Sequence, residues 1–257
     1  MRSFFGVFPE ATDFTVRGEV DLDGPLDADL VVFAFQVWYL APSPPSRAAL
    51  HSLGARLSGR DVIALTACRN MWYSAALDMQ RALTGVGARY RGIVAAVDTH
   101  PPLFTAITTV RWMLTGCREP FGIFPRAGVG AGELARLRTL GERLARDDGT
   151  AGLGQRVEQV LADADAAPVA PVLAAADLLT SRLFSASGKA IRASTRPGGR
   201  ARQVELAAVA GGIVFLLVVG VPAVAAVRLI ASRRFDHEVM RRLAPAVRRL
   251  PEPRKSR

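Results

Sequence analysis

The stretch that decides the fold is residues 29–86, DLVVFAFQVWYLAPSPPSRAALHSLGARLSGRDVIALTACRNMWYSAALDMQRALTGV. It contains two short apolar runs, Leu30–Phe35 and Val62–Thr66, which are rich in β-branched and aromatic residues and do not alternate with polar ones. Such runs are typical of strands buried on both faces of a parallel sheet. Apolar residues at helical spacing follow each run, over Ala49–Leu57 and Trp72–Val86. The stretch therefore predicts two successive strand–helix units of a doubly wound α/β sheet.

A loop with polar and aromatic residues separates each predicted strand from its helix. In doubly wound sheets, ligands bind beyond the carboxyl ends of the strands, where both loops would lie. A planar isoalloxazine ring needs flat apolar faces above and below it and polar groups at its edge, and the two loops offer both. The candidate cofactor-binding residues are Gln36, Trp38, Tyr39, Leu40, Cys68, Arg69, Asn70, Met71 and Trp72.

The predicted sheet has further strands and one notable gap. Gly92–Val97 reads as the last buried strand, with Asp98 at its carboxyl end, and Thr15–Val20 as an edge strand. No strand followed by a Gly/Ser/Thr-rich phosphate loop precedes Asp29. We therefore expect residues 1–146 to form a flavodoxin-like sheet that lacks its N-terminal strand and phosphate loop, from a start that is truncated or misassigned. A fold of another origin is the alternative.

Charge is distributed unevenly along the chain. Residues 1–181 carry a net charge of −2 and residues 182–257 a net charge of +12, within a total of +10. This excess flanks one apolar segment, which is typical of a membrane anchor and argues against nucleic-acid binding. Two cysteines give neither a disulfide framework nor metal-ligand spacing, so we expect the α/β part to be cytoplasmic.

The C-terminal half is expected to associate with a membrane. Residues 147–203 read as a linker followed by a basic amphipathic helix that lies in the membrane interface. Residues 204–230 include 22 consecutive positions without a charge, Leu206–Val227, long enough to cross the bilayer or to re-enter it. Arginines flank both ends equally, so the orientation is left open. Residues 231–257 read as a basic tail.

A long apolar connection runs from Asp98 to Gly132. Connections in such folds are usually about 2–6 residues long, and longer ones tend to be functional. One interpretation is a lid that extends the core. The other is a substrate-binding wall for alkyl chains, made by Trp112, Met113 and Leu114.

Three segments carry a family resemblance: Gln36–Ser43 (QVWYLAPS), Cys68–Trp72 (CRNMW) and Thr108–Gly116 (TTVRWMLTG). They resemble the flavodoxin-like proteins of the dialkylresorcinol condensing enzyme family, over roughly Phe4 to Ala145. The resemblance implies FMN as cofactor, a ketosynthase as protein partner and an alkyl-chain substrate. It also implies that this component oxidises an alkylated cyclohexanedione to the aromatic resorcinol. This chain departs from the family pattern at the absent phosphate loop, which puts FMN binding in question.

The functional expectation is a membrane-anchored, FMN-dependent oxidoreductase (aromatase) that contacts membrane lipid. Its ring would lie between the aromatic loops, with Asn70 bonding the ring edge or a substrate carbonyl. No GxSxG, HExxH or CxxC motif occurs, and the histidines (His51, His100, His237) stand far apart in the sequence, so catalytic residues are not assigned. The alternatives are a non-catalytic membrane adaptor that docks the ketosynthase, and a general flavodoxin-like quinone reductase.

Overall fold

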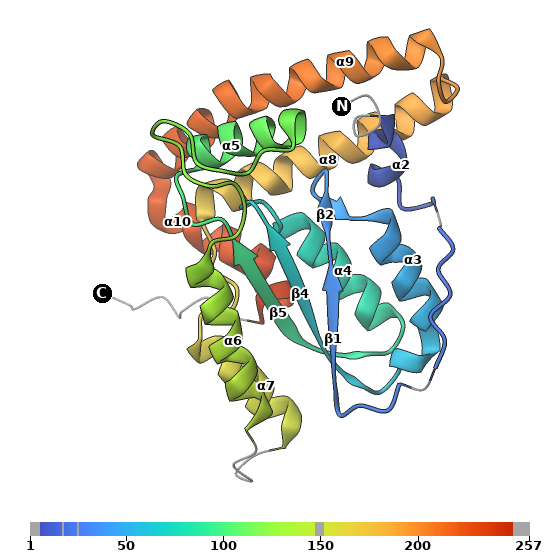
Figure 1. Cartoon of the computed structure of the whole chain (residues 1–257), viewed down its shortest axis with the longest axis vertical. Coiled ribbons are helices and arrows are strands. Elements are labelled where there is room, and N and C mark those ends of the chain that lie inside the picture. Colours follow the sequence, from blue (N-terminus) through green and yellow to red (C-terminus); the bar gives the residue numbers. More distant parts are fainter. Residues whose placement is uncertain (1–5, 17, 25, 147–151, 249–257) are drawn as a thin grey trace.

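The computed structural model describes residues 6–16, 18–24, 26–146 and 152–248. At its centre three parallel strands form one sheet in the order β1-β4-β5 (Figure 1). They are β1 (Leu30–Phe35), β4 (Asp61–Cys68) and β5 (Arg89–Val97). Leu30 pairs with Asp61, and Val62 pairs with Tyr90. The mixed α/β class and the parallel sheet of three strands are confirmed.

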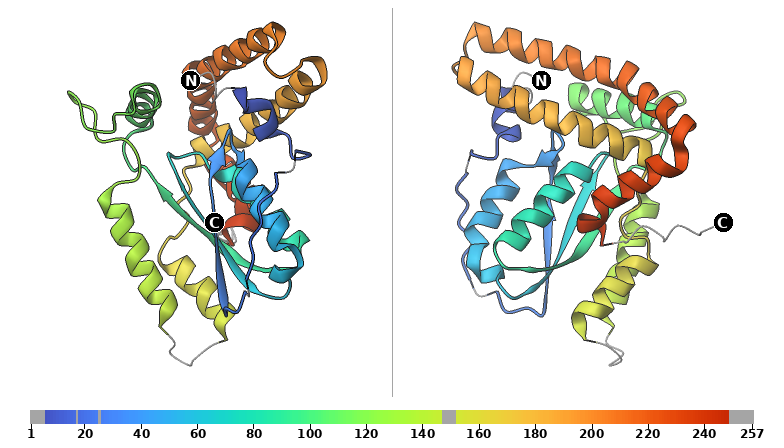
Figure 2. Two further views of the ribbon diagram at one scale, coloured as in Figure 1. Left: turned by 45° about the vertical axis from the view of Figure 1, so that its right-hand side comes forward. Right: turned by 180° about the vertical axis from the view of Figure 1, so that it is seen from behind.

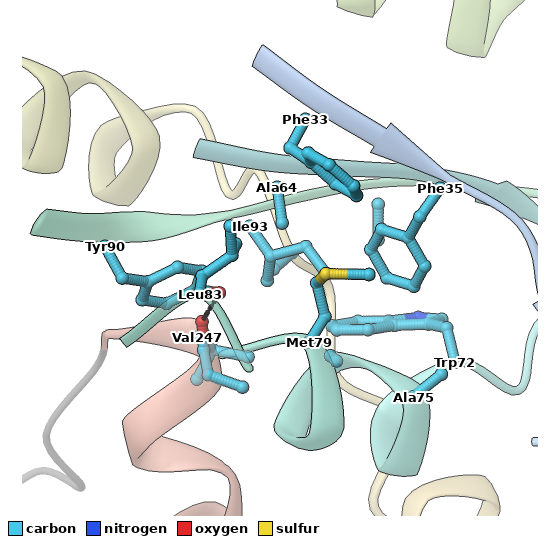
Figure 3. Close-up of a cluster of buried hydrophobic side chains, with 14 of the residues drawn as sticks. Phe33, Phe35, Ala64, Trp72, Ala75, Met79, Leu83, Tyr90, Ile93 and Val247 are labelled. Carbon is cyan, nitrogen blue, oxygen red and sulfur yellow. Dashed lines mark hydrogen bonds between the residues drawn. The ribbon is translucent and has the colours of Figure 1, made fainter. Parts of the chain in front are cut away.

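The main core lies on the face of the sheet covered by α4 (Tyr73–Gly85). Figure 3 shows Phe33 and Phe35 of β1 packed together with Trp72 and Met79. The C-terminal part of α10 (Val221–Val247) closes the same cluster. There the Tyr90 hydroxyl donates to the carbonyl of Ala246 at 2.6 Å. The apolar spacing along α4 therefore forms the core-facing stripe that the sequence predicts.

The opposite face is only partly covered. Two helices, α6 (Ala131–Ala145) and α7 (Leu153–Asp163), cover this face beside β5 (Figure 2). There Ile63, Val94, Leu140 and Val157 form a second cluster. The two helices leave β1 open, so Val32 is 51% exposed and Ala34 is exposed as well. The expectation that the β1 run is buried on both faces is therefore wrong, since burial alternates along it.

The chain turns sharply after β1. A short hairpin of β2 (Val37–Trp38) and β3 (Ala41–Pro42) precedes α3 (Pro44–Leu53), where the Ser43 side chain accepts from the backbone N–H of Ser46 at 3.3 Å. The short 3-10 helix η1 (Gly54–Leu57) follows α3. At the N-terminus α2 (Phe8–Thr12) is a helix. The described residues of 15–20 form no strand.

In place of a linker and an interfacial helix, residues 152–194 add α7 and α8 (Pro171–Ser194) to the body of the molecule. Helix α8 packs across the start of α4, and its fully buried Asp177 accepts hydrogen bonds from the backbone N–H groups of Tyr73 at 3.1 Å and Ser74 at 2.9 Å. Residues 147–151 of the predicted linker lie outside the described residues. The helix that the sequence assigns to the membrane surface is therefore a core element.

One long apolar helix lies near the C-terminus. It consists of α9 (Arg200–Phe215), the π-helical turn η2 (Leu216–Gly220) and α10. Its apolar part has a mean hydropathy of 2.6 over 18 residues, of which 0% is buried, so by length and composition it could cross a membrane. Pro222 lacks the N–H that would bond one turn back, which accounts for the π turn.

At Ala231 the backbone is non-helical (φ −130°, ψ 37°), and this kink separates the apolar segment from the part of α10 that packs against the sheet domain. Beyond it, Val239, Leu243, Ala246 and Val247 are buried against the sheet domain. Residues 231–248 are therefore part of the core rather than a basic tail, and 249–257 lie outside the described residues.

Candidate functional site

Two neighbouring strands bring polar residues together at the carboxyl edge of the sheet. Strand β4 ends at Cys68 and continues into Arg69 and Asn70, while β5 ends at Val97 and continues into Asp98. The Asp98 backbone N–H donates to the carbonyl of Arg69 at 2.9 Å, which fixes the two chain turns against each other. This is the edge at which doubly wound sheets bind ligands.

An aspartate–histidine pair lies at the end of β5. The Asp98 carboxylate is 1% exposed, and its Oδ1 lies 2.7 Å from Nδ1 of His100, whose side chain is 40% exposed. The same oxygen accepts from the His100 backbone N–H at 3.1 Å. When Nδ1 donates to the carboxylate, Nε2 is the unprotonated nitrogen, and it makes no hydrogen bond within the described chain. The pair is thus arranged as an oriented base open to solvent.

Arg69 is a half-buried cation without an ion pair to any carboxylate among the described residues. Burial lowers the pKa of its guanidinium, an effect opposed by the nearby Cys68 and Asp98. A guanidinium offers five donors in a fixed planar arrangement, suited to carbonyl and carboxylate oxygens. Arg69 can therefore bind an oxygen that gains negative charge beside Asp98 and His100.

Helix α5 (Pro102–Thr115) completes the site from above the strand ends. The Asn70 side-chain amide donates to Oγ1 of Thr105 at 3.4 Å, and both residues are buried. The Oδ2 atom of Asp98 is also buried and has no hydrogen-bond partner in the described structure. Buried polar atoms are normally hydrogen-bonded, so this oxygen can accept a further hydrogen bond from a bound water or ligand.

Cys68 does not supply a nucleophile to this cluster. Burial raises the pKa of its thiol to about 12, further raised by Asp177 and partly offset by Arg69. The thiolate, not the thiol, is the reactive form. Among the described residues, no group of three His, Cys, Asp or Glu side chains is placed to hold a metal ion. The chemistry that this cluster supports is proton transfer.

The structure separates several residues that the sequence grouped around a flavin. Trp72 is fully buried in the main core and offers no exposed ring face (Figure 3). Tyr39 packs edge-on against Phe8 with ring centroids 5.0 Å apart, and Leu40 joins the same cluster, which faces α2 and α8. The prediction that Tyr39 and Trp72 form facing walls around a ring is therefore wrong.

The other predicted residues divide into two groups. Cys68, Arg69 and Asn70 belong to the carboxyl-edge cluster. Trp38 and Met71 are half-buried and the Gln36 side chain is exposed. The proposed alkyl wall of Trp112, Met113 and Leu114 is exposed at the end of α5 and lines neither of the grooves described below.

The N-termini of α3 and α4 do not offer a site for the phosphate of FMN. A flavin phosphate is normally held by backbone N–H groups at a helix N-terminus. At α4, the helix that follows β4, the carboxylate of Asp177 already accepts from the first two of these N–H groups. The preceding helix α3 is capped by Ser43.

Two grooves lie on another side of the molecule. One of about 580 Å³ lies between α3 and α4, and one of about 480 Å³ lies between α4 and α8. The second is lined by Tyr39 and Leu40 together with Arg81, Arg182 and Arg242. Neither groove is lined by Arg69, Asp98 or His100, so the grooves and the carboxyl-edge cluster are distinct.

Sequence reasoning missed the central pair of the cluster. In the sequence, Asp98 was assigned only to the end of a strand, and His100 was set aside because it is far from the other histidines. The signal that could have identified the pair is an aspartate and a histidine two residues apart at a strand end. Thr105 gave no sequence signal, because its contact with Asn70 depends on how α5 folds back.

No protein-family model, curated protein or solved structure matches this chain.

Proposed function

We propose that this chain is a flavodoxin-like, membrane-anchored enzyme that removes a proton beside a carbonyl of an alkylated cyclohexanedione. This would be the proton-transfer half of the oxidation of that ring to a dialkylresorcinol. The observation that carries the proposal is the buried Asp98 holding His100 at the carboxyl edge of the sheet. The family resemblance of the neighbouring Cys68–Trp72 loop supplies the substrate class.

The roles follow from the positions of the side chains. Nε2 of His100 accepts a proton from a ring methylene next to a carbonyl. Asp98 keeps the imidazole in the required tautomer and stabilises the imidazolium that forms, as in other aspartate–histidine pairs. Arg69 and Asn70 donate to the carbonyl oxygen, which becomes the enolate oxygen. The base that accepts the proton and the donors that stabilise the negative charge of the enolate therefore belong to one cluster.

The full oxidation also removes a hydride from the next ring carbon. That hydride needs a two-electron acceptor, and the carboxylate of Asp177 already occupies the N-terminus of α4. We therefore assign the acceptor to a separate component of the flavin or quinone class. The proposed activity of this chain is enolisation, which requires no acceptor and can be measured alone.

The position of the site suits an alkyl substrate. Helix α5 and the apolar α9–η2 segment lie at the end of the molecule where the strands terminate (Figure 1). An alkyl chain dissolved in a bilayer at that end would keep its polar ring near the carboxyl edge. Burial of each methylene contributes about 0.8 kcal/mol, so long chains would partition strongly into the membrane.

The test reconstitutes the full chain in proteoliposomes and uses NMR to monitor the incorporation of solvent deuterium into the ring methylene beside the carbonyl. The carbon between the carbonyls exchanges unaided and serves as an internal standard. His100→Gln should slow catalysed exchange by about 10²–10⁴-fold, the usual contribution of a general base. His51→Gln, an exposed histidine of α3, is the matched control and should leave exchange unchanged. Equal rates for wild type and His100→Gln would refute the proposal.

A second candidate is the non-catalytic adaptor, and the open side of β1 favours it. Within the described residues β1 pairs only with β4, and its uncovered face exposes Val32 and Ala34. An unpaired, partly apolar edge is a common place for another protein to add a strand. If this candidate holds, the chain should show no catalysed deuterium exchange, and Val32→Lys should abolish its co-elution with the ketosynthase. Co-elution that survives Val32→Lys would remove this candidate.

A further inference from the structure

Helix α5 buries two threonines and exposes most of its large apolar side chains. Thr105 and Thr108 are its buried residues, whereas Leu103 is 69% and Leu114 is 55% exposed. A surface helix of a water-soluble domain shows the opposite arrangement. The exposed apolar side chains of α5 are Leu103, Ile107, Val110, Trp112, Met113 and Leu114. Contiguous exposed apolar surface of this kind marks an interaction site.

The loop after α5 extends the same surface and is held in a defined shape. Backbone bonds join Phe121 and Phe124 in both directions, at 3.1 and 2.9 Å. Arg111 donates to the carbonyl of Glu119 at 2.6 Å, which ties the loop back to the helix. The tip of this turn presents Ile123, which is 77% exposed. The exposure of Ile123 therefore results from an ordered turn.

Two arginines lie over aromatic rings within this surface. The guanidinium carbon of Arg118 is 4.6 Å from the centroid of Trp112, and that of Arg111 is 4.3 Å from the centroid of Phe121. Tryptophan and arginine side chains of this kind concentrate at the membrane–water boundary, where the ring lies at headgroup level and the cation faces lipid phosphate. The charges on this surface thus complement an anionic headgroup layer.

The place of α5 in the fold agrees with this chemistry. Figure 1 and Figure 2 show α5 at the same end of the molecule as α9, beyond the carboxyl ends of the strands. Helix α9 begins the apolar segment that is long enough to span a bilayer. A bilayer that holds this segment therefore lies at the end of the molecule where α5 exposes its apolar side chains.

We propose that α5 and the Phe121–Phe124 turn form a second, peripheral membrane contact, with their apolar side chains among the lipid acyl chains and Arg111 and Arg118 at the headgroups. The occupant of this surface is the lipid bilayer. The inference goes beyond the proposed enzymatic activity and does not depend on it, because it concerns the outer face of α5 and not the inner face that contacts Asn70.

The test uses Trp112 as a reporter of depth in the full chain, reconstituted in vesicles that contain brominated lipid. Trp38→Phe removes one of the other two tryptophans, and the fully buried Trp72 gives a constant background. We expect brominated lipid to quench Trp112 and aqueous iodide to leave it unquenched. Trp112→Phe in the same background should lose the quenched emission. Quenching by iodide but not by brominated lipid would overturn the proposal, and is the result expected if this surface is reserved for a protein partner.

A matched pair of variants separates specific contact from general association with the membrane. Leu114→Glu places a charge on the proposed contact and should abolish quenching of Trp112 by brominated lipid. Leu134→Glu changes a similarly exposed leucine on α6 and should leave quenching unchanged. Both variants should stay in the membrane fraction, because the C-terminal segment is intact. Unchanged quenching in Leu114→Glu would contradict the proposed contact.

Discussion

A single buried carboxylate joins two parts of the chain that are far apart in the sequence. Asp177 of α8 accepts from the first two backbone N–H groups of α4, where Trp72 at the N-cap position makes no side-chain cap. Burial raises the pKa of Asp177 to about 7, even though the hydrogen bonds from Ser74 and Tyr73 act to lower it. The carboxylate thus satisfies the helix end while its charge carries a desolvation cost.

The shifted pKa of Asp177 predicts that stability depends on pH. An acid whose pKa is higher in the folded than in the unfolded state binds more protons when folded, so its contribution is most favourable below about pH 4 and falls until about pH 7. The loss over this range is on the order of 4 kcal/mol if the full shift is realised. Asp177→Asn should flatten this part of the profile of unfolding free energy against pH, measured by urea denaturation in detergent. An unaltered slope would contradict this role.

Removing the acceptor at position 177 should destabilise the start of α4 directly. Asp177→Ala leaves the Tyr73 and Ser74 N–H groups buried without a partner, which should lower the unfolding free energy by about 2–5 kcal/mol. Asp163→Ala, at the C-terminus of α7, is the control and should cost less than about 1 kcal/mol, because its side chain is exposed. Equal losses in the two variants would show that the capping contact is unimportant.

The residue-scale errors of the sequence prediction have a common cause. Trp72 and Tyr39 were assigned to a flavin because aromatic residues at strand ends serve either ligands or the core, and composition does not distinguish these uses. The outcome depends on α8 and α2, which cover the aromatic loops from distant parts of the chain. Arg69 and Asn70 do lie at the strand end, because their position follows directly from the end of β4, and their role in ligand binding stays a prediction.

At the scale of elements, the two faces of β1 should respond differently to substitution. Val32 is half-exposed on the open face, whereas Phe33 lies in the main core. Phe33→Ala should lower the unfolding free energy by about 3–5 kcal/mol, because it leaves a cavity. Val32→Thr should change it by no more than about 0.5 kcal/mol. Urea denaturation of both variants in detergent gives the comparison, and a loss above 2 kcal/mol in Val32→Thr would mean that another element covers this face.

The sequence predicts elements well where local pattern determines them and poorly where packing does. The three strands and the helices α3 and α4 follow from apolar runs and helical spacing. The role of α8 does not follow from its sequence, because an amphipathic helix has the same sequence pattern whether its apolar stripe faces lipid or protein. Positive φ angles at Tyr39 (51°) and Leu40 (64°) are equally unpredictable, since such a turn normally contains Asn or Gly.

At the scale of the whole molecule, attachment to the membrane should depend on apolar burial rather than charge. The apolar stretch of the C-terminal helix is unburied within the protein, so the full chain should stay in the membrane fraction in 1 M salt, where charges are screened within roughly 3 Å. Detergent should release it. Release by salt alone would show that the basic residues, and not the apolar span, hold the protein to the membrane.

The occupied N-terminus of α4 also leads to a prediction about the visible absorption of the purified protein. Without the hydrogen bonds to a phosphate, each contributing roughly 1.5–3 kcal/mol, flavin binding should be weaker by several powers of ten. The full chain purified in detergent should therefore be colourless or nearly so. One equivalent of tightly bound FMN, seen in the visible absorption spectrum, would show that other residues hold the phosphate.

The central claim is that the substrate ring binds at the carboxyl edge, beside Asp98 and His100. The most direct measurement is photo-crosslinking of the full chain in proteoliposomes with an alkylated cyclohexanedione that carries a diazirine, with adducts located by mass spectrometry. The account predicts adducts within residues 69–72 and 98–108 that the unlabelled dione displaces. Displaceable adducts confined to the groove between α4 and α8, at Tyr39 or Arg182, would contradict it.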